Sequence, residues 1–177
     1  LNQNIDEKII IIFVAKPLKE LESEKLGAKF YDYIKSNDLM EVYITNPENK
    51  NILDLNSFIH GAELKSYEFN LYKSKKNNKI INLILDKKNI NQKVKKFEAI
   101  LNGVNFTRDL VSEPGNILHP DEYVKRLLKL KKIGVKVTVY DEKKLKKMGC
   151  NALLGVGQGS IRGSYLVTME WNGNKSS

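Results

Sequence analysis

Residues 120–149 read PDEYVKRLLKLKKIGVKVTVYDEKKLKKMG, and the spacing of their apolar side chains changes from helical to strand-like and back. Pro120 suits the first turn of a helix, and the carboxylates of Asp121 and Glu122 suit its positive end. Gly134 is placed to end that helix. Three valines then alternate with other residues, as in a half-buried strand: Val135, Val137 and Val139. The run therefore predicts a helix followed by a strand.

A second, shorter helix completes this unit. Asp141 is a favourable N-cap residue, Leu145 and Met148 supply an apolar side, and Gly149 closes the helix. Residues 165–171 are predicted to form a final strand. The run from 120 to 149 thus predicts a compact helix–strand–helix unit within an α/β architecture.

Upstream of this unit the alternation of strands and helices recurs. Residues 9–15 are continuously apolar, which predicts a strand covered on both faces. The other elements predicted here are strands at 41–45 and 79–86 and helices at 18–34 and 52–72. This part of the chain is therefore expected to be a small α/β domain.

A stretch rich in lysine and asparagine at 87–93 marks the predicted internal division, and a long helix follows it. Apolar residues from Val94 to Val111 recur in steps of three and four, and Pro114 with Gly115 ends the helix. We expect an N-terminal α/β domain at 1–90, incomplete at its start, and a linking helix with the loop after it at 91–116. Residues 117–177 are expected to begin a second α/β domain that is incomplete.

Composition narrows the class of protein. The 177 residues are 41% hydrophobic and 29% charged, as in a soluble globular protein. No apolar run reaches the about 20 residues that a membrane-spanning helix needs. No signal peptide is recognised, and Cys150 alone cannot form an internal disulfide. A cytoplasmic protein without a membrane partner is expected. Because the chain starts at Leu1 and closes on a loop-like stretch at 172–177, we expect it to be a segment of a longer protein.

The net charge is compatible with a polyanionic partner. The net charge is +9 and the isoelectric point about 9.4, values that fit a DNA-binding module. The positive charge is almost all lysine, however, since the arginines are Arg108, Arg126 and Arg162. Readers of bases and phosphates favour arginine, so a general compositional bias toward lysine is the preferred interpretation.

The glycine-rich run 155–160, GVGQGS, invites comparison with phosphate-binding loops. A dinucleotide fingerprint needs a helix directly after it, and here Arg162, Gly163 and a strand follow instead. No lysine occupies the position that a P-loop requires. The run is therefore predicted to be a shaped connecting loop.

No residue set predicts a catalytic or metal centre. His60 and His119 lack carboxylates at metal-ligand spacing, so helix-entrance or surface roles are expected for them. Cys150 is expected to pack as a small residue. Salt bridges to neighbouring elements are expected for three charged residues on or near the long helix: Arg108, Asp109 and Glu113.

Several motifs after residue 105 occur in the order found in one known family. Residues 107–116 read TRDLVSEPGN, 134–137 read GVKV, 145–149 read LKKMG, 152–160 read ALLGVGQGS, and 170–173 read EWNG. Together they resemble the start of the catalytic domain of leucyl aminopeptidases, the cytosol aminopeptidases of the two-metal M17 family. The segment before residue 100 is only loosely similar to the variable N-terminal α/β domain of that family. The resemblance therefore assigns 117–177 to the beginning of the aminopeptidase catalytic domain.

The resemblance implies a hexameric, cytoplasmic metallo-aminopeptidase that removes N-terminal residues, preferably leucine, from peptides. Two divalent ions, manganese or zinc, would activate water and hold the substrate. The family's metal ligands and catalytic residues lie in motifs beyond the last predicted strand, so none is assigned in this chain, and Lys175 is not one. Arg108, Glu113 and Asn116 match the loop that leads into the catalytic domain, where a structural role is expected. The chain alone is expected to be inactive and to bind no metal.

Two alternatives stay open from the sequence. The chain could be a basic DNA-binding module, or a scaffolding module that lacks the catalytic half and partners an intact subunit. Neither the physiological peptides nor the preferred metal follows from the residues.

Overall fold

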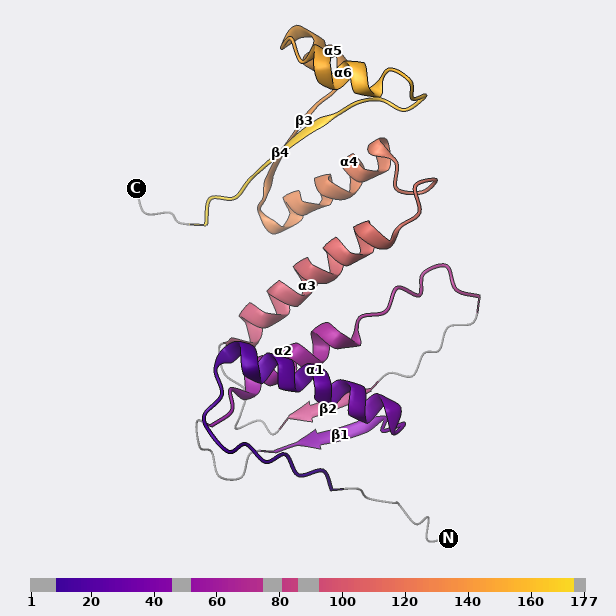
Figure 1. Cartoon of the computed structure of the whole chain (residues 1–177). Coiled ribbons are helices and arrows are strands. Elements are labelled where there is room, and N and C mark those ends of the chain that lie inside the picture. The colour runs from indigo at the N-terminus through magenta and orange to yellow at the C-terminus, as the bar shows by residue number, and fades with distance from the viewer. Residues whose placement is uncertain (1–8, 46–51, 75–80, 86–92, 174–177) are drawn as a thin grey trace. The chain divides into compact units, whose positions relative to one another are not determined.

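A computed structural model of the chain describes residues 9–45, 52–74, 81–85 and 93–173 (Figure 1). The chain divides into two compact units, Leu1–Thr107 and Arg108–Ser177. Helices and strands alternate in both, which confirms the predicted α/β class. The three-part division at 1–90, 91–116 and 117–177 stays a prediction.

The first unit contains two helices and a pair of parallel strands. The elements are α1 (Glu20–Ser36), β1 (Glu41–Ile44), α2 (Leu55–Ser66) and β2 (Asn82–Leu85). Strands β1 and β2 pair in register from Glu41 opposite Asn82 to Ile44 opposite Leu85. Parallel neighbours need a crossover connection, and α2 supplies it. Figure 1 shows α1 and α2 together above the two strands.

Local capping explains where these helices begin. The backbone N–H of Lys19 donates to the Glu22 carboxylate at 2.8 Å, at the start of α1. Asp54 caps α2 by accepting from the backbone N–H of Asn56 at 3.1 Å. The apolar faces of the two helices then form the core of the unit, which consists of Phe30, Tyr31, Ile34, Phe58 and Ala62.

The two helices approach closely because each carries a glycine at the contact. A Cβ built on Gly27 of α1 would lie 1.8 Å from the carbonyl oxygen of Phe58 in α2. A Cβ on Gly61 of α2 would lie 1.9 Å from the carbonyl oxygen of Glu24 in α1. Ser23 and Ser57, four positions before each glycine, are fully buried. A side chain at either glycine would therefore separate the helices.

The prediction of a buried strand at 9–15 is wrong. The structure assigns no strand there, and Phe13 is 91% exposed, although Ile10 packs against the core. A continuous apolar run is buried only where neighbours cover both of its faces. Among the described residues, the sheet of this unit consists of β1 and β2 alone.

The remaining predictions for this part differ from the structure mainly in where the helices and strands begin and end. The predicted helix at 52–72 is confirmed only as α2, which ends at Ser66. The strands predicted at 41–45 and 79–86 are confirmed over shorter ranges as β1 and β2. The predicted stretch at 87–93 lies outside the described residues except for its last position. The long helix that follows it is confirmed as α3 (Lys93–Ser112).

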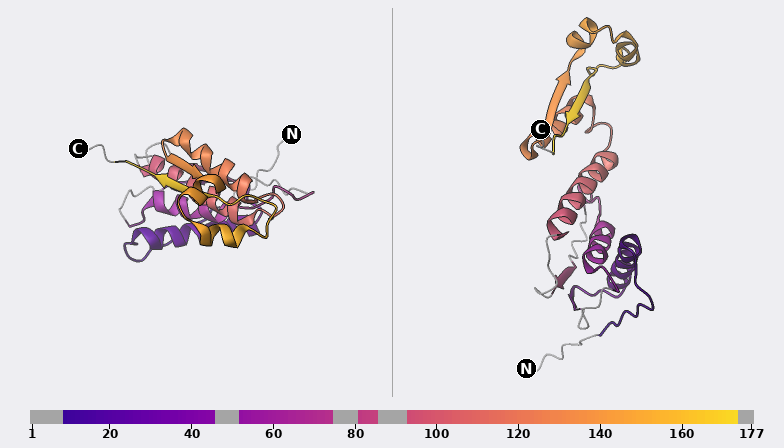
Figure 2. Two further views of the ribbon diagram at one scale, coloured as in Figure 1. Left: turned by 90° about the horizontal axis from the view of Figure 1, so that it is seen from above. Right: turned by 90° about the vertical axis from the view of Figure 1, so that its left-hand side faces the viewer.

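The second unit is built on an antiparallel strand pair. After α3 come α4 (Pro120–Leu128), the 3₁₀ helix η2 (Lys129–Ile133), β3 (Lys136–Tyr140), α5 (Glu142–Lys147), α6 (Asn151–Gly157) and β4 (Leu166–Glu170). Strands β3 and β4 pair from Lys136 opposite Glu170 to Tyr140 opposite Leu166. Both views of Figure 2 show them side by side. The buried hydrophobic residues of this unit, among those described, are Val124, Leu127, Val137 and Leu145.

The predicted turns of the helix–strand–helix unit are confirmed. Gly134 and Gly149 have φ values of 92° and 75°, the left-handed conformation that glycine adopts without steric cost. Gly134 follows η2, and Gly149 follows α5. Asp141 caps α5 by accepting from the backbone N–H of Lys144 at 3.0 Å. The capping residues at both ends of α5 thus match those read from the sequence.

The prediction that 155–160 is entirely a connecting loop is wrong in its first half. Gly155, Val156 and Gly157 form the last turn of α6. A Cβ at Gly157 would lie 1.9 Å from the hydroxyl oxygen of Ser164. The glycine at this position therefore lets the segment before β4 lie against the helix, at the cost of its low helix propensity.

Candidate functional site

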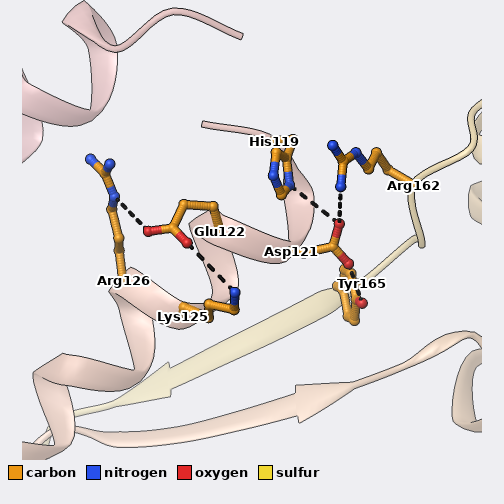
Figure 3. A network of polar contacts seen from close by, with 7 residues as sticks. All are labelled: His119, Asp121, Glu122, Lys125, Arg126, Arg162 and Tyr165. Carbon is orange, nitrogen blue, oxygen red and sulfur yellow. Dashed lines mark hydrogen bonds and ion pairs between the residues drawn. The ribbon is translucent and has the colours of Figure 1, made fainter. Parts of the chain in front are cut away.

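One polar cluster of the second unit is centred on Asp121, in the first turn of α4 (Figure 3). Its Oδ1 accepts a hydrogen bond of 2.7 Å from the hydroxyl of Tyr165, just before β4. Its Oδ2 lies 3.2 Å from Nδ1 of His119 and 3.9 Å from a guanidinium nitrogen of Arg162. One carboxylate thereby joins the start of α4 to the segment that precedes β4.

These contacts shift the acidities of the cluster. The hydrogen bond from Tyr165 lowers the pKa of Asp121, and the nearby His119 and Arg162 act in the same direction. The same hydrogen bond raises the pKa of the Tyr165 hydroxyl. Asp121 is therefore an ionised acceptor at neutral pH, engaged by its neighbours rather than poised to take a proton from a substrate.

A second group on α4 ties the helix to the chain before it. Arg126 donates to the carboxylate of Glu113 at 2.7 Å, and the Glu113 side chain is only 2% exposed. Glu122 lies 3.4 Å from the Arg126 Nε and 3.8 Å from the ammonium of Lys125. The hydrogen bond to Glu113 raises the pKa of Arg126. The salt bridge predicted for Glu113 is confirmed, and its partner is Arg126.

The two histidines have different surroundings. His119 is the N-cap residue of α4, which confirms the expected place at a helix entrance. The same expectation is wrong for His60, which lies within α2, is 3% exposed and packs its ring on Phe97 of α3. Burial lowers the pKa of His60. The imidazole of His60 therefore acts as a packing ring on the inner side of α2, next to Gly61.

The other described residues singled out from the sequence lie on α3, in the turn after it and at the start of α6. Cys150 is half-buried as the N-cap residue of α6, while Arg108 and Asp109 lie on α3. Asn116 is exposed in the turn between α3 and α4. Lys175 lies outside the described residues.

The donor set does not fit a two-metal centre. Within residues 9–45, 52–74, 81–85 and 93–173, no group of three or more histidine, cysteine, aspartate or glutamate side chains is placed to hold an ion. Among these residues His119 and Asp121 form only a pair, and Oδ1 of Asp121 already accepts the hydrogen bond from Tyr165. Asp121 could not be linked to Tyr165 from the sequence, because 44 positions separate them and no local pattern connects the two.

Comparison with known proteins decides the family. Residues 105–177 match the catalytic domain of the cytosol aminopeptidase family. A probable cytosol aminopeptidase of Brucella melitensis is 37% identical over 181 residues, which cover 96% of this chain and 37% of that protein. The chain belongs to the cytosol aminopeptidase family. The resemblance to the N-terminal region of a leucyl aminopeptidase is thereby confirmed.

A second cytosol aminopeptidase is also similar in sequence, and solved structures share the fold. A probable cytosol aminopeptidase of Phytoplasma mali is 48% identical over 127 residues, which cover 67% of this chain and 26% of that protein. The bottromycin maturation enzyme BotP in complex with Mn shares the fold, with a TM-score of 0.71, 19% identity, and coverage of 89% of this chain and 34% of that chain. A mutant of tomato leucine aminopeptidase has a TM-score of 0.70 and 20% identity, and the match covers 88% of this chain and 34% of that chain. The chain thus spans about a third of the length of the cytosol aminopeptidases and structures that it matches.

No helix among the described residues combines the length and the apolar character that crossing a bilayer requires.

Proposed function

We propose that this chain is part of a leucyl aminopeptidase, which releases N-terminal amino acids, preferably leucine, from peptides by two-metal hydrolysis. The observation that carries the proposal is the 37% identity to a probable cytosol aminopeptidase over 96% of the chain. The match of 105–177 to the catalytic domain of the family supports it independently of the N-terminal unit.

In this proposal the 177 residues supply scaffold and no catalytic side chain. Asp121, His119 and Arg162 hold the start of α4 to the segment before β4, and Glu113 with Arg126 holds α4 to the loop before it. The two metal ions, manganese or zinc, would be bound by residues outside this chain. A solved relative in the fold comparison, BotP, is described in complex with Mn, which supports a divalent ion. Assembly into a hexamer and a cytoplasmic location belong to the same proposal.

Hydrolysis of a leucyl anilide tests the proposal. The 177-residue chain is assayed with added Mn²⁺ or Zn²⁺ beside the intact gene product that contains it, whose mass is measured first. We expect the longer protein to release the anilide in a reaction that a chelator abolishes, and the 177 residues to release none. Chelator-sensitive hydrolysis by the 177 residues would contradict the assignment of the catalytic residues. An intact mass near 20.3 kDa would contradict the assignment to a larger peptidase.

A basic binding or scaffolding module is the second candidate, and the charge distribution is the observation that favours it. The net charge is +9. Lysines on η2 and α5 are exposed in the second unit: Lys129, Lys131, Lys132, Lys143, Lys144, Lys146 and Lys147. Exposed lysines in such number attract polyanions without sequence preference. The salt dependence of that attraction separates this candidate from the first.

A further inference from the structure

The contact between α2 and α3 in the first unit depends on a buried histidine. The rings of His60 and Phe97 have centroids 4.6 Å apart and are tilted by 31°. The two residues are 3% and 7% exposed, so each ring covers the other from water. The N-terminal half of α3 therefore contacts α2 through an imidazole ring.

The surroundings of the imidazole disfavour an added proton. Within the described part of the chain, Nδ1 of His60 is buried and has no hydrogen-bond partner. Burying a charged imidazolium without an acceptor is far less favourable than burying the neutral ring. The carboxylates of Glu24 and Glu20 on α1 attract a proton to His60, but burial outweighs them and lowers its pKa.

A pair of like charges on the same two helices has the opposite pH dependence. Glu63 on α2 has a raised pKa, first because it is partly buried and then because Glu98 on α3 repels its charge. Protonation of Glu63 as the pH falls therefore favours contact between α2 and α3. Lys96, which precedes Phe97 on α3, is exposed.

We propose that His60 makes the packing of α3 on α2 sensitive to acid, with protonation of the imidazole releasing Phe97 and the first turns of α3. The neutral ring stacks on Phe97, whereas the charged ring is stable only where water reaches it. The contact is complete above the pKa of an exposed histidine, about 6.5, and weakens as the pH falls from there toward the pKa of the buried ring. Glu63 opposes this weakening at lower pH.

Amide hydrogen exchange of the 177-residue chain tests the proposal. Exchange of residues 94–104 is compared at pH 7.0 and 5.5 after correction for the intrinsic pH dependence, with residues 136–140 of β3 as an internal reference. We expect the corrected exchange of 94–104 to rise several-fold at pH 5.5, up to about tenfold for each unit of difference between the buried and exposed pKa values. Residues 136–140 should not change.

Three variants test whether His60 causes the rise in exchange at low pH. H60F keeps a ring on Phe97 without a titratable group and should abolish the rise, whereas E63Q removes the opposing charge and should preserve it. F97A uncovers His60 and should bring its pKa, followed by NMR in the same chain with His119 as the second histidine, toward about 6.5. Equal rises in the unmodified chain and H60F would overturn the proposal. If H60F does not fold, an unchanged His60 titration in F97A would overturn it as well.

Discussion

Substitution of Gly27 is expected to lower the free energy of unfolding strongly, although alanine adds only a methyl group. A methyl group there would meet the carbonyl oxygen of Phe58 at 1.8 Å, and backbone cannot move aside as a side-chain tip can. Gly27→Ala should therefore lower the free energy of unfolding by about 1–3 kcal/mol through overpacking. Denaturation in urea, followed by circular dichroism, measures the change.

Gly103 on α3 is the matched control, since a Cβ there would meet nothing within 4 Å. Alanine is the better helix former, so Gly103→Ala should raise the stability by up to about 1 kcal/mol. Equal losses of stability in both variants would mean that backbone conformation, and not the helix contact, decides the effect.

Glu113 is the buried member of the ion pairs on α4. Its side chain is 2% exposed and lies 2.7 Å from Arg126, so Glu113→Gln leaves a guanidinium facing a neutral amide. We expect a loss of about 1.5–3 kcal/mol, since a charged hydrogen bond to a buried carboxylate is lost while Glu122 stays beside the guanidinium. Glu122→Gln, at a more exposed partner of the same arginine, should cost below about 1 kcal/mol. Thermal melts of the two variants side by side would reveal any reversal of this order.

The hydrogen bond between Tyr165 and Asp121 predicts a pH dependence with two limits. It lowers the pKa of Asp121, so its contribution is present above the unfolded pKa of about 3.9 and is lost as the pH falls through the lower folded value. It raises the pKa of Tyr165, so the contribution is complete below about pH 10 and is lost as the pH rises through the folded value of the tyrosine.

Tyr165→Phe removes both effects at once. The difference in Tm between the unmodified chain and this variant should be largest and flat between about pH 5 and 9 and should shrink toward both extremes. A difference that does not vary with pH would contradict a stabilising hydrogen bond from the Tyr165 hydroxyl to Asp121.

Among the elements, α5 is short enough for its cap to matter. Asp141 accepts the hydrogen bond from the Lys144 backbone N–H that begins this helix. Asp141→Ala should lower the free energy of unfolding by about 1 kcal/mol, whereas Asp141→Asn, which keeps the acceptor, should stay near the unmodified value. Chemical denaturation of the pair measures the two changes, and an equal loss in both would assign the effect to charge instead of to the cap.

The elements that could be predicted are those whose signal is local. Pro120, Asp141, Gly134 and Gly149 mark starts and ends, and the structure places helix limits at or beside them. Residues 9–15 were predicted wrongly because burial of an apolar run depends on distant neighbours that the run does not encode. The last turn of α6 was missed because two glycines hide its periodicity, and only the approach of Ser164 explains one of them.

The cluster around Asp121 could not be predicted for the same reason. Its members come from the start of α4 and from the segment before β4, and the antiparallel pairing of β3 with β4 brings them together. The burial of His60 also depends on a partner, Phe97, that lies on another helix. By contrast, the family could be predicted, because its motifs between 105 and 173 are short and occur in order.

For the whole molecule, the charge of +9 separates the two candidate functions. Nearly all of the positive charge is carried by lysine, so retention on duplex DNA should be weak. It should vanish by about 0.15 M salt, where the Debye length is about 8 Å. Chromatography on immobilised DNA at stepped salt concentrations measures this. Tight retention at 0.15 M with a steep salt slope would favour the binding module over the peptidase.

The close contact of α1 and α2 also has a genetic consequence. Every single-base change of a glycine codon that alters the residue introduces a side chain with a Cβ, and at positions 27 and 61 that atom would collide with backbone of the facing helix. The two codons are therefore intolerant of any missense change, however conservative. The codon for Gly103, whose surroundings are open, can drift toward alanine without penalty. Tolerance to mutation at these positions is thus decided by the packing of two helices and not by catalytic residues.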